Sequence, residues 1–329
     1  MPRNGQISRI SVWVLIAIGL ALPFVASDYW VFMLASVWTA AVVILGMNFT
    51  IQHTGLVSLG QAAVSAVGAY VAVILAMQHG VPLILAVALG GVAAGVVGLV
   101  LALAAVRVKG PYFSILTIIF AWSIPEILNL TTGITGGYNG MFATQPTFGP
   151  FTANATMYYF AFFVLLLGVW VVGNLERSTI GRALQIIKLS PKVASSCGIN
   201  AVLMQSLGVT VGNVLAGIGG GLFAYLTGAI SPSSFDFTQS AYYLIGSIVG
   251  GLASPVGAIL GAAVVTVVPQ ILAGASYYAG VLLGLVLVVS LTFLPQGLVG
   301  IRLGRRPRVK TQPAPQTGEV SDDVRAAGG

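Results

Sequence analysis

The amino-acid sequence predicts an all-α polytopic membrane protein with about ten transmembrane helices, one or more of them broken, and both termini in the cytoplasm. Of the 329 residues, 57% are hydrophobic and only 6% are charged, whereas a soluble domain carries about 25% charged residues. Several apolar runs approach or exceed the roughly 20 residues that cross a bilayer as a helix. The 42 glycines predict closely packed helices, because small residues let backbones approach each other in lipid.

The N-terminal region divides into a cytoplasmic segment, residues 1–9, and a first span, residues 10–26. The same run resembles a cleavable signal peptide, with Val25-Ala26-Ser27 as a small-residue cleavage site. A second hydrophobic span follows almost at once, which favours retention of the first. Both alternatives leave Asp28 outside, so the later topology is the same in either case.

Spans two to five are expected at about 29–51, 56–77, 83–106 and 112–130. The turn between spans four and five contains Arg107 and Lys109 and is expected in the cytoplasm. The loop after span five, residues 131–156, is rich in Gly, Thr and Asn and contains no Lys or Arg. This composition indicates a periplasmic loop.

Span six is expected at 157–175 and span seven at 201–228, with a polar, basic cytoplasmic segment, residues 176–200, between them. The apolar run 239–272 is too long for one helix, and the sequence G-G-L-A-S-P-V-G at 250–257 divides it into two spans. A tenth span at 277–294 completes the transmembrane domain, residues 10–300. The basic tail, residues 301–329, has the composition of a disordered segment.

The distribution of basic residues orients these spans. Two of the 14 Lys and Arg residues precede span one, two lie between spans four and five, four lie in 176–200 and six follow span ten. All of them therefore fall on one side, which the positive-inside rule identifies as the cytoplasm. The net charge of +7 reflects this asymmetry, and no nucleic-acid partner is expected.

The sequence contains no site for enzymatic chemistry or for ATP. A Walker A loop needs a Gly before its Lys-Ser/Thr pair, whereas Val309 precedes Lys310-Thr311, the chain's single such pair. No cofactor or metal is expected in this chain, since His53 and His79 lie at span ends without metal-site spacing. Glu126, the single acid predicted inside a span, lies near the outer end of span five. There it is either interfacial or part of a transport path.

The basic segment 176–200 contains signals for one short helix. Ser190-Pro191 is typical of a helix start, and Gly198 of a helix end. A helix of about two turns is not stable alone in water, so it must pack against something. The segment is either a docking surface for a separate energy-supplying protein or a positive loop that only sets orientation. Cys197, the single cysteine, is expected to be a reduced thiol in this segment.

Polar or glycine-rich sequence inside otherwise apolar spans marks candidate positions on a translocation path. These positions are Ser58, Gln61, Gly250, Gly251 and Gly257. Glycines at GxxxG spacing, such as Gly217 and Gly221, indicate either close helix packing or helices that slide during alternating access.

Four stretches, in this order along the chain, carry a resemblance to a known family. They read T-G-L-V-S-L-G-Q-A-A-V-S-A-V-G-A-Y, I-T-G-G-Y-N-G-M, G-R-A-L-Q-I-I-K-L-S-P-K-V-A-S-S-C-G-I-N, and I-S-P-S-S-F with G-G-L-A-S-P-V-G-A-I-L-G-A. Over roughly residues 40–300 the chain resembles branched-chain amino acid ABC transporter permeases, and T-G-G-Y-N-G-M is similar to the M-type permease of the pair. The chain departs from the family pattern at Ser190-Pro191 and Ser195-Ser196, which leaves the ATPase partner open.

The resemblance implies a permease subunit of an importer for branched-chain or other apolar amino acids in the bacterial cytoplasmic membrane. It implies three kinds of partner: a second related permease, two ABC ATPase subunits that hold ATP and Mg²⁺, and an extracytoplasmic solute-binding protein. The short helix becomes a coupling helix that docks on the ATPase, and this role is carried over to Gly181, Arg182, Lys188, Ser190, Pro191, Lys192 and Gly198. The alternatives are import of urea, short amides or sugar within the family, and a self-contained facilitator or ion-coupled carrier outside it.

Overall fold

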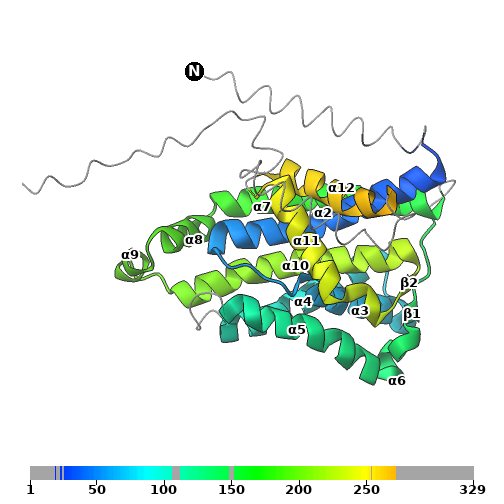
Figure 1. The fold of residues 1–329 in the computed structure, drawn as a ribbon, viewed down its shortest axis with the longest axis horizontal. Coiled ribbons are helices and arrows are strands. Elements are labelled where there is room, and N and C mark those ends of the chain that lie inside the picture. Colours follow the sequence, from blue (N-terminus) through cyan, green and yellow to red (C-terminus); the bar gives the residue numbers. More distant parts are fainter. Residues whose placement is uncertain are drawn as a thin grey trace, which may run out of the picture.

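Long apolar helices lie side by side in the protein (Figure 1). The computed structural model describes residues 26–105, 112–147, 152–252 and 254–271, together with Gly19 and Pro23. Within these residues, six helices are long and apolar enough to cross a membrane. The elements are α2 (Asp28–Thr54), α3 (Gln61–His79), α4 (Leu83–Ala105), α5 (Tyr112–Leu130), α6 (Thr132–Thr135), η1 (Gly137–Asn139), β1 (Met141–Phe142), α7 (Ala153–Arg177), α8 (Thr179–Leu189), α9 (Pro191–Ser196), α10 (Ala201–Thr227), β2 (Ala229–Ile230), η2 (Pro232–Phe235), α11 (Phe237–Gly250) and α12 (Pro255–Ile271).

The all-α membrane architecture is confirmed, and α2, α4, α5, α7 and α10 correspond to predicted spans two, four, five, six and seven. The N-terminal segment 1–9, most of the first span, the tenth span and the tail 301–329 lie outside the described residues. Span six was predicted too short, because α7 begins at Ala153 rather than 157. The Thr152 hydroxyl accepts a hydrogen bond from the Ala155 N–H and thereby caps the helix.

Helix α10 is the centre of the bundle and packs against α2, α3 and α4. Its glycines make this possible. A Cβ at Gly217 would overlap the Ala94 side chain of α4, and one at Gly220 would overlap the Ser65 carbonyl of α3. A Cβ at Gly212 would overlap the Thr50 hydroxyl of α2 and lie 2.6 Å from the Gly46 carbonyl oxygen. The prediction of close packing at glycine is therefore confirmed for α10.

Helix α3 begins later than predicted, at Gln61 instead of 56. Gly55 ends α2 in the left-handed conformation, with φ of 72°. The chain then runs without helical structure from the end of α2 back toward the middle of the bundle (Figure 1). Two side chains of α5 satisfy the backbone of this stretch: Thr117 accepts the Leu59 N–H at 3.0 Å, and Ser114 donates to the Val57 carbonyl at 2.8 Å.

The predicted break in the run 239–272 is confirmed, since α11 ends at Gly250 and α12 begins at Pro255. α11 has 14 residues and crosses the bundle at a slant (Figure 1). A Cβ at Gly250 would overlap the Gly257 carbonyl, and one at Gly257 would overlap the Gly251 carbonyl. Glycine at these positions lets the two helices form a tight elbow.

The two ends of the bundle differ in structure. α8 and α9 form one end, called the basic end, and a short antiparallel pair, β1 with β2, lies at the other, called the hairpin end (Figure 1). The predicted loop 131–156 is thus shorter than expected and is ordered within its described residues by α6, η1 and β1. Gly136, Gly137 and Gly140 all have positive φ values, which glycine adopts without steric cost.

Candidate functional site

The basic end is built by a sharp change of direction after α7. The Ser178 hydroxyl caps α8 by accepting the Gly181 N–H at 3.4 Å. A Cβ at Gly181 would lie 2.5 Å from the carbonyl oxygens of Leu175 and Glu176. Gly181 therefore allows α8 to pack against the end of α7, which assigns a packing role to a residue predicted for coupling.

Helix α8 was missed in the sequence, where 176–200 was expected to hold one short helix. It is an amphipathic helix that buries Ala183, Leu184 and Ile187 and exposes Arg182. The apolar spacing of Leu184 and Ile187, following a capping Ser178, is a helical signal that could have located it.

Helix α9 has the predicted caps. The Ser190 hydroxyl accepts the Val193 N–H at 3.4 Å, and Pro191 occupies the first turn. Gly198 has φ of 73°, the left-handed conformation expected after a helix end. The Ala194 side chain is fully buried. Burial of this side of α9 supplies the packing that so short a helix requires.

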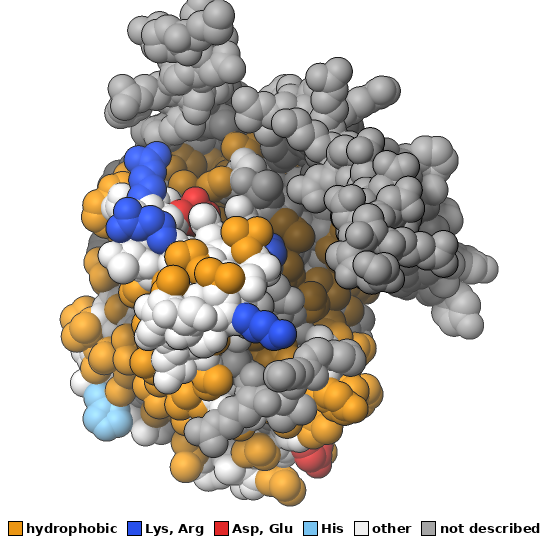
Figure 2. Space-filling model, turned by 90° about the vertical axis from the view of Figure 1, so that its left-hand side faces the viewer, with side chains coloured by type: hydrophobic (Ala, Val, Ile, Leu, Met, Phe, Trp, Pro, Cys, Tyr) orange, Lys and Arg blue, Asp and Glu red, His pale blue; other side chains and the backbone are white. Residues whose placement is uncertain are grey.

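The exposed side chains of these two helices form a mixed apolar and basic surface, here named the α8–α9 surface. Its members are Arg182, Ile186, Leu189, Lys192 and Val193. Leu189 is 87% exposed and Val193 55% exposed. Figure 2 looks onto this end and shows Lys and Arg side chains on the same face as hydrophobic ones. Sequence reasoning found Arg182 and Lys192 but missed Ile186, Leu189 and Val193, whose exposure depends on the missed helix α8.

Lys188, although predicted for docking, contacts the chain's own α2. Its ammonium group donates to the Gln52 carbonyl at 2.7 Å. Close by, the imidazole of the buried His53 lies 3.9 Å from the Glu176 carboxylate and stacks on Phe49. These contacts attach α8 and the end of α7 to the end of α2.

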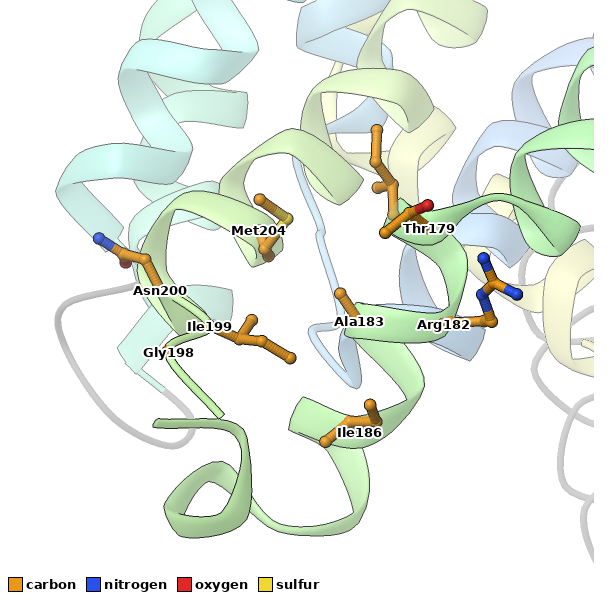
Figure 3. A pocket seen from close by; sticks show the side chains of 9 residues that line it. Thr179, Arg182, Ala183, Ile186, Gly198, Ile199, Asn200 and Met204 are labelled. Carbon is orange, nitrogen blue, oxygen red and sulfur yellow. The ribbon is translucent and has the colours of Figure 1, made fainter. Parts of the chain in front are cut away.

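An apolar groove of about 580 Å³ lies between α8 and the beginning of α10 (Figure 3). The residues that line it are Thr179, Ile180, Arg182, Ala183, Ile186, Gly198, Ile199, Asn200 and Met204. Arg182 and Ile186 belong both to this groove and to the α8–α9 surface. The groove and the surface are therefore parts of one continuous site.

A second candidate site lies inside the bundle, at the beginning of α3. Ser58 and Gln61, both predicted path residues, are buried there, and the Ala62 N–H donates to the Ser240 hydroxyl of α11 at 3.0 Å. A cavity of about 10 Å³ adjoins this point, and its polar lining comes from Ser58, Thr117 and Asn213. Neither Thr117 nor Asn213 was identified from the sequence.

The three path glycines lie elsewhere, in the elbow between α11 and α12. Gly250 is ten residues after Ser240 along α11, or about 15 Å at the helical rise. The Asn48 amide of α2 donates to the Gly251 carbonyl at 3.5 Å and accepts from the Ser247 hydroxyl. The structure therefore brings Ser58 and Gln61 together but places Gly250, Gly251 and Gly257 in a separate elbow, where Gly251 accepts a hydrogen bond from Asn48 of α2.

Neither site has the composition of a metal centre. Within the described residues, no three His, Cys, Asp or Glu side chains are grouped so that they could hold a metal ion. Glu126 is exposed on α5, four residues before its end at Leu130 and toward the hairpin end.

Comparison with known proteins identifies a family model that covers most of the chain. The model is described as the permease component of branched-chain amino acid transport systems, and it matches residues 29–291. Similar proteins include LivM, the high-affinity branched-chain amino acid transport system permease protein, from Salmonella typhimurium and from Escherichia coli. They are 27% and 26% identical, respectively, over 94% of this chain and 79% of their own length. No solved structure matches the chain significantly.

Proposed function

The chain belongs to the family of branched-chain amino acid transport permeases, and from this premise we propose that it is the permease subunit of an ATP-binding-cassette importer. The family consists of transport components, so the chain is a multi-pass membrane transporter subunit and not an enzyme. The proposed solutes are branched-chain or other apolar amino acids, and the proposed location is the bacterial cytoplasmic membrane.

The observation that carries the proposal, beyond the family itself, is the α8–α9 surface. Leu189 and Val193 expose apolar area next to Arg182 and Lys192, and apolar anchors with adjacent charges are typical of protein–protein contacts. We assign this surface to the ATPase subunits, which would hold ATP and Mg²⁺, with no cofactor in this chain. The alternative, in which segment 176–200 is a positive loop that only sets membrane orientation, does not account for two ordered helices with capped ends.

Contacts of the basic end explain how docking would be transmitted to the membrane helices. Lys188 joins α8 to the end of α2, and Asn200 caps α10 by accepting the Leu203 N–H. A displacement of α8 and α9 would therefore act directly on α2 and on the central helix α10. Gly181 and Gly198 set the turns that hold this unit in place.

The proposed topology has ten spans with both termini in the cytoplasm. Arg177, Arg182, Lys188 and Lys192, the Lys and Arg residues within the described ranges, all lie at the basic end, which supports a cytoplasmic position for it. The hairpin end would then face the extracytoplasmic solute-binding protein. The second, related permease completes the membrane part, and the translocation path is proposed to include Ser58, Gln61, Gly250, Gly251 and Gly257.

Uptake by proteoliposomes tests this function. The purified chain alone is expected to give no leucine uptake, because we assign the energy source to separate subunits. Addition of the second permease, the ATPase subunits and the loaded binding protein is expected to give uptake that requires ATP hydrolysis. Radiolabelled leucine is measured with ATP and, as the control, with a non-hydrolysable analogue.

Two outcomes would contradict the proposal. Solute flux through the chain alone would indicate a facilitator or an ion-coupled carrier. ATP-dependent uptake of urea, a short amide or a sugar, with none of leucine, isoleucine or valine, would retain the importer and reject the amino-acid substrate.

A further inference from the structure

We propose that the first turn of α3, together with Gln61 and Asn213, is an intramembrane site that binds the carboxylate of a zwitterionic amino acid. The inference rests on the proposed import function and adds to it the chemical group that the path recognises. Three features carry it: the position of the helix start, its free N–H donors, and two buried amides that have no hydrogen-bond partner among the described residues.

The beginning of α3 lies near the middle of the bundle. Ser65 contacts Gly220 of α10, and Gly68 contacts Gly217. α3 and α10 run in the same direction, since Ala72 further along α3 accepts from the Tyr225 hydroxyl of α10. Gln61, one turn before Ser65, is therefore level with the central turns of α10, whose 27 residues extend about 40 Å.

The first turn of α3 presents two free donors at this depth. The first N–H groups of a helix have no partner within the helix. The Gly60 N–H donates to Ser58 and the Ala62 N–H to Ser240, but the N–H groups of Gln61 and Ala63 have no partner among the described residues. Such donors, together with the positive end of the helix dipole, favour an anion.

Two buried side-chain amides adjoin this turn and lack hydrogen bonds. Gln61 is 1% exposed, and both its amide nitrogen and its amide oxygen are without partners. Gln61 directly follows Gly60, which lines the adjoining cavity, and its buried amide belongs to the same turn as the free N–H groups. Asn213 is 4% exposed and lines the cavity that Gly60, the residue before α3, also lines. No hydrogen bond joins the Asn213 amide to another described residue.

The unpaired Gln61 amide is unfavourable in an apolar interior, because its donor and acceptor have lost water without gaining a partner. A ligand that satisfies them would offset this cost. The carboxylate accepts from the N–H and amide donors, and the hydroxyl oxygens of Ser58 and Thr117 supply acceptors for the ammonium group. No Asp, Glu, Lys or Arg lines the cavity, so a neutral zwitterion suits it better than a charged solute.

The described conformation is closed around this site. Its cavity of about 10 Å³ holds no more than a water-sized group. Phe113 and Phe120 of α5 line its far side, and α5 is the least buried of the six long helices. Entry of an amino acid therefore requires α5 to move away from α3, which the sparse packing of α5 permits.

Binding to the purified full-length chain in lipid nanodiscs tests the site, with L-leucine, 4-methylpentanoate and L-leucinamide as probes. Leucine is expected to bind, 4-methylpentanoate to compete because it keeps the carboxylate, and leucinamide to compete at least tenfold more weakly. Gln61→Leu and Asn213→Leu are each expected to weaken leucine binding roughly tenfold or more, since each removes a hydrogen bond to a charged group. Thermal unfolding without ligand should show no loss of stability in Gln61→Leu, because that change removes an unpaired buried amide.

Asn129→Leu is the matched control, since the Asn129 amide oxygen is also buried without a partner but lies at the other end of α5. It should bind leucine like the wild type. Absence of leucine binding, equal competition by leucinamide, or wild-type affinity in both site variants would overturn the site. ATP-dependent leucine uptake together with any of these results would leave the proposed function standing. Carboxylate-dependent binding without ATP-dependent uptake would instead contradict the proposed function and leave the site intact.

Discussion

Replacing Leu189 by Asp is expected to abolish ATP-driven uptake while the chain remains folded and inserted in the membrane. The Leu189 side chain is 87% exposed, so the change leaves internal packing intact. On the proposed ATPase contact, however, it removes a central apolar anchor and buries an unpaired carboxylate. A loss of about 2–4 kcal/mol of docking free energy is typical for such a position and corresponds to a roughly 30- to 1,000-fold weaker contact. Substrate-stimulated ATP hydrolysis and leucine uptake by the reconstituted importer measure the effect.

Asn174→Asp is the control for the added charge. Asn174 is exposed near the end of α7 but lies outside the α8–α9 surface. Its uptake and hydrolysis should stay near wild type. If the Leu189→Asp variant is expressed normally and still couples ATP hydrolysis to substrate, the proposed docking role of the α8–α9 surface is wrong.

Replacing Gly68 by Val is expected to destabilise the fold strongly. A Cβ at this position would overlap the Cα and the carbonyl oxygen of Gly217 and lie 2.6 Å from its carbonyl carbon. Because all three are backbone atoms, no side-chain rearrangement relieves the clash, and α3 must move away from α10. Overpacking typically costs about 1–3 kcal/mol and sometimes more. Displacing a helix from the centre of the bundle is expected to cost a free energy near the upper end of this range. The unfolding midpoint in detergent should therefore fall by at least about 5 °C.

Gly173→Val separates this clash from the intrinsic effect of valine in a helix. Gly173 lies within α7, and a Cβ there would meet no atom within 4 Å. Its unfolding midpoint is expected to change by no more than a degree or two, since the helix propensities of Gly and Val differ by only a few tenths of a kcal/mol. Equal stability of the two variants would contradict the central packing of α10.

The positions of most spans could be predicted because they depend on apolar length. The bounds of α5 agree at both ends, and the elbow between α11 and α12 follows from Gly250 and Ser254-Pro255, which interrupt a helix locally. The caps of α9 were also predicted, because Ser190, Pro191 and Gly198 act on their own backbone neighbourhood. Features of this kind depend on a residue and its near neighbours in the chain, so the sequence alone is enough to predict them.

Features that depend on distant contacts were mispredicted or missed. The stretch before Gln61 is apolar enough to extend a span, but its backbone bonds to Ser114 and Thr117, which lie 57 and 58 residues further along the chain. The contact of the Lys188 ammonium group with the Gln52 carbonyl of α2 was likewise not visible in the sequence, and the docking role of Lys188 stays a prediction. The exposure of Leu189 and the isolation of the Asn213 amide likewise depend on how helices meet.

Labelling of Cys197 tests most directly whether the α8–α9 surface is the cytoplasmic ATPase contact. Cys197 is the single cysteine of the chain, is exposed and directly follows α9. A membrane-impermeant maleimide is expected to label it in inside-out vesicles and not in right-side-out vesicles, and bound ATPase subunits should slow the labelling at least tenfold. Labelling from the outside, or labelling that the ATPase does not slow, would contradict the assignment.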